Sequence, residues 1–325
     1  MQYGEDDTME TRKLVKSGLS SHVIAIPKEF LAENKLKTGD TLFLERQGKR
    51  TILVSAATPQ SSDKKLKVKT IDVDGRPLRH VERDIIEAYL KSYNEIIVNL
   101  DSPSQAMEIK KYIGYLVAME VVQEDNRQVV AKDFLNYNDI NVERAIRRIE
   151  HIVGSMIADL KEVERDPELA KVIVERDYDV NRMGYLVMRV MQVAMSDPSV
   201  AETLKIDPLR IIQLWSINIH LEKIGDETKR LGKKVAQYGI RHNKRLFYEI
   251  HGRIYRTYED TLGAFHGSDR KLLDKNPDER VRIKAMIEQY NKNNGSIPMA
   301  EMMGLFQQMV SHLADINRST RYVGE

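Results

Sequence analysis

The sequence predicts a multidomain fold in which a small all-β hairpin domain and a small α/β connector precede an all-α domain. Three patterns along the 325 residues lead to this fold class. Short strand-like segments bounded by glycine and proline come first, helix and strand patterns then alternate, and the remainder carries apolar residues at helical spacing. The predicted domains are residues 9–56, 57–140 and 141–325.

The first predicted domain consists of short strands and one helix. The strands are expected at residues 12–18, 20–27, 41–45 and 51–54, with a helix at residues 28–34 and a turn at Gln47-Gly48-Lys49. A segment this small with so few apolar positions cannot close a core in one chain. Its strands are therefore expected to be shared between two chains in an intertwined dimer.

Three short motifs in this domain resemble a known family. Ser17-Gly18, Ile26-Pro27-Lys28 and Leu36-Lys-Thr-Gly-Asp40 match the pattern of the AbrB/SpoVT-type swapped-hairpin domain. The family resemblance implies that basic side chains contact DNA phosphates, which gives a salt-sensitive contact with little base readout. The residues implied are Arg12, Lys13, Lys16 and Lys28. The alternative is that the hairpins serve only to dimerise the chain.

Residues 57–140 predict a linker followed by a small α/β connector. The polar stretch Thr58–Lys69 is typical of a linker. Helices are expected at residues 81–92 and 102–113, and strands at residues 95–100, 117–123 and 128–132. This order is similar to the connector between such hairpins and helical bundles in archaeal-type fusion proteins. No catalytic constellation occurs in it.

The chain is predicted to be helical from residue 141 onward. Helices are expected at residues 143–160, 166–195, 208–238, 244–265, 278–290 and 299–322, with a break at Asn294-Gly295. They form two sets of three, about residues 141–240 and 241–325, because His220-Leu221 and His312-Leu313 fall at the same point of the third helix in each set. We interpret both histidines as half-buried packing residues.

A polar row runs beside the apolar stripe of the third helix. Glu222 and Asp226 lie one turn apart on one face, and Gly225 leaves room for another helix to approach. Two carboxylates at this spacing repel each other unless they are solvated, paired or bridged by a cation. A cation site is one interpretation. The other is a solvated face on which Lys223 and Lys229 act as partners.

The preceding helix carries a carboxylate on its apolar stripe. Asp177 falls between Ile173 and Val180, where an unpaired carboxylate would be costly to bury. Asp179 and Glu175 are alternatives that lie on a different face of the same helix. Asp177 is therefore expected to face a partner or a metal ion.

The segment from His220 to Asp226 resembles the "LExIGD" signature of the PhoU family of phosphate-uptake regulators. Asp177-Tyr-Asp-Val-Asn181 matches that family's motif in the preceding helix, with tyrosine where lysine is usual. The resemblance implies tandem three-helix bundles with a metal cluster between these helices. Its implied ligands are Asp177, Asn181, Glu222 and Asp226.

The second repeat departs from this pattern. Ala314 and Arg318 stand where the first repeat has its two carboxylates, and Arg318 brings a cation to a ligand position. The acids that remain are Asp315, with Asp274 or Asp278 on the helix before. We expect one competent acidic cluster, with the second degraded or replaced by an ion pair.

Composition sets further bounds. The formal net charge of +2 is near balance and does not by itself indicate a polyanion-binding protein, and the absence of cysteine leaves oxygen and imidazole ligands for any metal. No apolar run reaches membrane-spanning length, so no membrane insertion and a cytoplasmic location are expected. No phosphate-binding loop, nucleophile elbow or kinase motif is present.

The resemblances imply a non-enzymatic, metal-binding regulator of phosphate uptake and phosphate signalling that forms a homodimer and acts on DNA. Iron, zinc, manganese or magnesium is the implied metal, and a phosphate ABC transporter or sensor kinase the implied partner. Two alternatives stay open. One is a transcription factor whose helical half only senses or oligomerises. The other is a di-metal carboxylate enzyme, although the Glu-x-x-His pairs of ferritin-like sites are missing.

Overall fold

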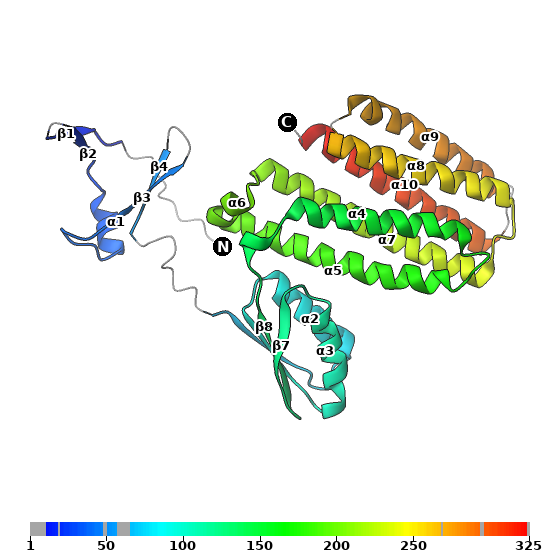
Figure 1. Cartoon of the computed structure of the whole chain (residues 1–325), viewed down its shortest axis with the longest axis horizontal. Helices are drawn as coiled ribbons and strands as arrows, with labels where there is room; N and C mark the ends of the chain where they lie inside the picture. The colour runs from blue at the N-terminus through cyan, green and yellow to red at the C-terminus, as the bar shows by residue number, and fades with distance from the viewer. Residues whose placement is uncertain are drawn as a thin grey trace. The chain divides into compact units, whose positions relative to one another are not determined.

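The computed structural model describes residues 11–18, 20–47, 51–56, 66–267, 269–292 and 296–323. The chain splits into two compact units, Met1–Lys65 and Leu66–Glu325. Figure 1 shows the first unit in blue and the second from cyan to red. The predicted turn at Gly48-Lys49, most of the predicted linker and the break at Asn294-Gly295 lie outside the described residues.

The first unit contains two antiparallel hairpins and one helix. Its elements are β1 (Val15–Ser17), β2 (Ser21–Val23), α1 (Lys28–Glu33), β3 (Phe43–Gln47) and β4 (Thr51–Ser55). β1 pairs with β2 and β3 pairs with β4, in two separate sheets. None of the side chains described in this unit is buried, and Leu14 and Leu44 are 70% and 71% exposed. A single copy of the unit therefore has no apolar core among its described residues.

The second unit begins with an α/β domain. Its elements are β5 (Val68–Asp72), α2 (Leu78–Leu90), β6 (Glu95–Asn99), the 3-10 turn η1 (Pro103–Gln105), α3 (Ala106–Gly114), β7 (Met119–Glu124) and β8 (Gln128–Asp133). The sheet order is β5-β6-β8-β7, and only β5 and β6 are parallel. α2 and α3 pack against the sheet and bury Ile85 and Ile109. The predicted elements of this connector are confirmed.

Strand β5 corrects the predicted linker. Val68 and Lys69 were expected to belong to a linker ending at Lys69, but they begin a strand that pairs with β6. The pairing places Ile71 in the core at 3% exposure. Since its partner lies more than twenty residues away, this strand depends on tertiary pairing that local composition does not reveal.

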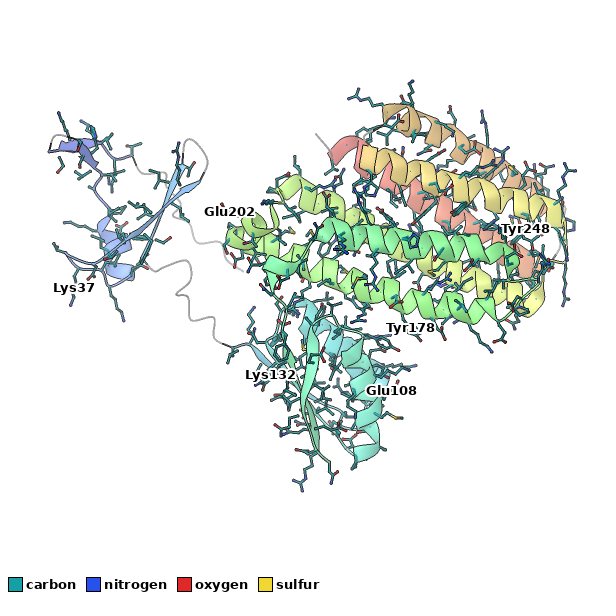
Figure 2. All side chains as sticks on the ribbon, in the orientation of Figure 1. Lys37, Glu108, Lys132, Tyr178, Glu202 and Tyr248 are labelled. Carbon is teal, nitrogen blue, oxygen red and sulfur yellow. The ribbon has the colours of Figure 1, made fainter. Side chains whose placement is uncertain are left out.

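The all-α domain follows. Its elements are η2 (Tyr137–Asp139), α4 (Val142–Asp159), η3 (Leu160–Glu162), α5 (Leu169–Ser196), α6 (Pro198–Leu204), α7 (Pro208–Tyr238), α8 (Lys244–Gly267), α9 (Arg270–Lys292) and α10 (Ile297–Val323). α4, α5 and α7 form one three-helix set, and α8, α9 and α10 form the other. α7 packs against α10, and one apolar core runs through both sets. Figure 2 shows side chains filling the space between these helices.

Asp-Pro pairs define two helix starts in this domain. The Asp207 carboxylate accepts a hydrogen bond from the Arg210 amide at 2.9 Å, and Pro208 occupies the first turn of α7. Asp197 and Pro198 start α6 in the same way. The sequence analysis did not predict α6, although the same pair of residues marks it.

Helix α9 begins earlier than predicted. The predicted start was near Asp278. Pro277 lacks the amide hydrogen that would bond to the Leu273 carbonyl. In the structure α9 starts at Arg270 and Pro277 lies inside it. The Asn317 side chain of α10 donates to the Leu273 carbonyl at 3.2 Å. This contact satisfies the acceptor that the proline leaves without its usual partner.

A buried ion pair joins the α/β domain to the bundle. Arg189 on α5 is 1% exposed and donates to Asp133 of β8, with one N–O distance of 3.0 Å. Its guanidinium also lies over the ring of Tyr89, 4.6 Å from the centroid.

Within the described residues, no helix is both long and apolar enough to cross a membrane.

Candidate functional site

Helices α5 and α7 bring two of the predicted carboxylates together around a lysine. Lys229 Nζ lies 2.5 Å from Asp177 Oδ2 and 2.6 Å from Asp226 Oδ1. Gly225 lies beside this group, and a side-chain carbon there would make ordinary contacts, 3.8 Å from Asp177 Oδ1 and 3.6 Å from Val180. We call Asp177, Asn181, Asp226 and Lys229 the acidic cluster.

Asp177 is the most buried member of this cluster. Its side chain is 4% exposed, and Oδ1 has no hydrogen-bond partner among the described residues. The Asn181 amide donates to Asp177 Oδ2 at 3.4 Å. Burial raises the pKa of Asp177, and the hydrogen bond from Lys229 opposes that rise. One buried carboxylate oxygen therefore keeps an unused acceptor.

Lys229 was predicted only as the partner of a solvated face. Burial lowers the pKa of Lys229, but its hydrogen bonds with Asp177 and Asp226 outweigh burial and raise the pKa overall. The lysine therefore remains a cation between the two carboxylates. The sequence signal for this contact was the position of Lys229, three residues after Asp226 and one turn further along the same face of the helix.

Glu222 lies apart from the contacts of the cluster. It is half-buried, and its ion pair is with Lys223 at 3.3 Å. Burial raises the pKa of Glu222, and Asp226 raises it further. The structure thus brings together three of the four predicted ligands, with Glu222 one turn away on α7. The alternatives Asp179 and Glu175 are exposed on the outer face of α5.

The acidic cluster suits a hard cation by chemistry. Its donors are carboxylate and amide oxygens, which Mg²⁺, Mn²⁺ and Fe³⁺ prefer, and Asp177 Oδ1 is buried without a partner. The Lys229 ammonium lies where such an ion would contact both carboxylates. A metal ion and this ammonium therefore exclude each other.

The second repeat replaces the carboxylates with neutral and basic groups. Arg318 forms an ion pair with Asp315. Asn276 on α9 is buried and donates to Asn317 at 3.1 Å. Asp274 pairs with Arg321, so neither acid expected on α9 joins Asp315. Asp278 is exposed.

The predicted DNA-contacting residues all lie in the first unit. Arg12 and Lys13 precede β1, Lys16 lies in β1, and Lys28 is the first residue of α1. All four side chains are exposed. The exposed hairpin residues include several large apolar side chains, among them Val15 and Ile24.

The helices form a tandem three-helix bundle whose first repeat holds the acidic cluster. Residues 146–235 match the PhoU domain. This match runs from α4 to α7 and contains all four predicted ligands.

Two solved structures are similar to part of the chain. One is the phosphate transport system regulatory protein PhoU from Streptococcus pneumoniae, with 16% identity, 56% of this chain and 92% of that chain covered, and a TM-score of 0.44. The other is PhoU from Pseudomonas aeruginosa, with 16% identity, 56% and 94% coverage, and a TM-score of 0.42. Comparison with curated protein sequences gives no match.

Proposed function

We propose that this chain is a non-enzymatic, metal-dependent regulator of phosphate uptake and phosphate signalling. The observation that carries the proposal is the PhoU-domain match over residues 146–235, because this segment holds the buried Asp177 and the partly buried Asp226 on either side of Lys229. A phosphate ABC transporter or a sensor kinase in the cytoplasm would be the partner that receives the signal. Catalysis is not part of the proposal.

The metal would be held by Asp177, Asn181 and Asp226, with Glu222 as a further ligand. When bound, it would supply positive charge between α5 and α7. Lys229 supplies that charge in its absence. The chain therefore has two alternative cations for one pair of carboxylates, and the site can report metal availability. The oxygen donors favour magnesium, manganese or iron over zinc.

The first unit would assemble two chains and contact DNA. Its described residues bury nothing in one copy, so its apolar hairpins need a second copy to cover them. The exposed cations Arg12, Lys13, Lys16 and Lys28 would then occur in symmetric pairs and meet DNA phosphates.

The regulatory proposal is tested by phosphate uptake in cells that lack the chromosomal copy and carry a plasmid copy. Wild-type protein should restore regulated uptake, and Asp177→Asn combined with Asp226→Asn should not. Lys223→Gln is the matched control on an exposed neighbour and should behave like wild type. Elemental analysis should show metal in the wild type and its loss in the double variant. Normal regulation by the double variant would refute the role of the site.

The DNA-binding proposal is tested separately by titration of labelled duplex DNA at several salt concentrations. Replacing Arg12, Lys13 and Lys16 by alanine should weaken binding to every sequence and flatten the salt dependence by about 0.9 in logarithmic slope for each lost phosphate contact. Binding with an unchanged salt slope would make the hairpins an assembly unit only. Light scattering after deletion of residues 1–56 then tests assembly, with a monomer expected.

A further inference from the structure

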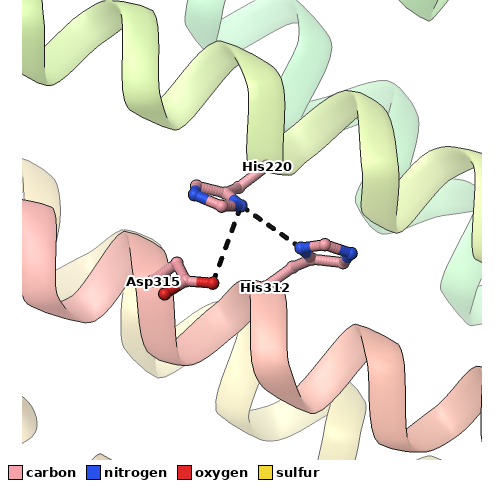
Figure 3. A group of neighbouring side chains, drawn as sticks. All are labelled: His220, His312 and Asp315. Carbon is pink, nitrogen blue, oxygen red and sulfur yellow. Dashed lines mark hydrogen bonds and ion pairs between the residues drawn. The ribbon is translucent and has the colours of Figure 1, made fainter.

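Two histidines and a carboxylate meet at the junction of the two repeats. His220 lies on α7, and His312 and Asp315 lie on α10 (Figure 3). The two Nδ1 atoms are 3.2 Å apart, and His220 Nδ1 lies 4.0 Å from Asp315 Oδ2. One ligand atom from each residue falls within 4.8 Å of the other two. We call this group the junction site.

The internal repeat explains why the histidines meet. α7 and α10 are equivalent helices that pack against each other, and each carries a His-Leu pair at the same point. When two equivalent helices pack, a residue near the centre of the contact meets its own counterpart, as in an isologous interface. The sequence analysis found the matching positions but assigned them to packing. The signal that could have revealed the site was their identical register.

The spacing of the junction site fits a tetrahedral metal. Two imidazole nitrogens bound to zinc at about 2.0–2.1 Å lie roughly 3.3 Å apart. The Nδ1 atoms, 3.2 Å apart, already have this separation, and Asp315 Oδ2 lies 4.0 Å from His220 Nδ1, about 0.7 Å beyond it. The Asp315 side chain is 27% exposed, which leaves room for it to close this gap.

Arg318 orients the third ligand. It pairs with Oδ1 of Asp315, and this contact leaves Oδ2 to face His220. Metal-binding carboxylates are commonly held by an outer hydrogen bond of this kind. Arg318 stands in the second repeat where the first repeat has Asp226. Through this ion pair it orients Asp315, which belongs to the junction site.

The charges around the junction site favour one class of metal. Arg318 cancels the charge of Asp315, and Lys223 on α7 acts on His312 as a further nearby cation. A hard cation such as Mg²⁺ would meet too little negative charge. Imidazole donors suit zinc, nickel and copper, which do not depend on carboxylate charge alone.

We propose that His220, His312 and Asp315 form a second metal site, which binds a divalent transition metal of the zinc class and links the two helical repeats. All three side chains are only partly buried, so water can complete the coordination. The site differs from the acidic cluster in donors and in metal preference. It therefore does not rest on the proposed regulatory function.

The test is a competition titration of the full chain with Zn²⁺ and a chromophoric chelator. His220→Gln and His312→Gln should each weaken one zinc site by at least tenfold. Asp177→Asn and Asp226→Asn should leave that site unchanged, since they belong to the acidic cluster. His266→Gln is the matched control, because His266 is also half-buried beside a carboxylate, that of Glu150 at 2.7 Å.

Wild-type zinc affinity in His220→Gln or His312→Gln would overturn the proposal, and so would loss of this site in Asp226→Asn. Circular dichroism checks that the variants remain helical. A second readout uses the intact wild-type chain, so that it does not depend on the folding of any variant. Its imidazole nitrogen resonances should show Zn²⁺ bound to Nδ1 of two histidines, and spectra without such a shift at saturating Zn²⁺ would equally refute the site.

Discussion

Helices α7 and α10 carry the same register but different chemistry. HLEKIGDET at residues 220–228 aligns with HLADINRST at residues 312–320. The apolar positions match and are buried, as Ile224 and Ile316 show at 0% exposure. The threonines also match, and each donates to the carbonyl four residues before it.

The differences fall at polar positions. Gly225 corresponds to Asn317, and Asp226 to Arg318. In the first repeat Gly225 lies beside the Asp177 carboxylate. In the second, the Asn317 amide bonds to the Leu273 carbonyl and to Asn276. Packing is thus kept in both repeats while the polar positions decide which one can hold a cation.

The largest effect is expected from Lys229→Met, which removes the cation of the acidic cluster. The variant leaves Asp177 buried and uncompensated, so urea denaturation should show a loss of about 3 kcal/mol in the free energy of unfolding. Adding Mn²⁺ should recover part of the loss. Lys223→Met, on an exposed neighbour, should stay within about 0.5 kcal/mol. Equal effects from both variants would contradict the role of Lys229.

The second repeat should respond to Asn317→Ala by losing about 2 kcal/mol, since buried polar groups lose their partners. Pro277→Ala returns an amide donor for the Leu273 carbonyl. Combined with Asn317→Ala it should therefore cost less than the sum of the two single changes. Zero coupling energy in this double-mutant cycle would show that Asn317 does not compensate for the amide hydrogen that Pro277 lacks.

Part of the pH dependence of stability should come from two carboxylates of the first repeat. Burial raises the folded-state pKa of Asp177 and Glu222, so the folded chain retains protons that the unfolded chain releases. Their contribution is present at low pH and is lost as pH rises from about 4 through the raised values. Asp177→Asn with Glu222→Gln should therefore gain stability relative to wild type as pH increases. Denaturation at several pH values measures this difference, and a constant difference would exclude the mechanism.

The smallest effect is expected from Gly225→Ala. The new carbon would make ordinary contacts at 3.6 Å with Val153 and Val180, and alanine favours the helix over glycine by roughly 0.5–1 kcal/mol. A change within about 1 kcal/mol, toward greater stability, should appear in thermal unfolding. A large loss would mean that α5 and α7 pack more closely than these contacts indicate.

Much of the fold followed from local patterns. Apolar spacing located the long helices, because this signal is contained in a few turns of chain. The linker end at Lys69 and the start of α9 were wrong, because a parallel partner strand and the Asn317 side chain come from distant segments. In the candidate site, helical spacing placed Asp226 on the correct face. The choice between Lys229 and a metal ion as its partner cannot be made from spacing.

The buried pair of Arg189 and Asp133 has a mechanical consequence. α5 carries Arg189 twelve residues after Asp177, which is about 18 Å along one rigid helix. Moving the sheet away from this helix has to break a buried ion pair. The contact with strand β8 and the carboxylate that faces Lys229 are thus held by the same rigid helix α5.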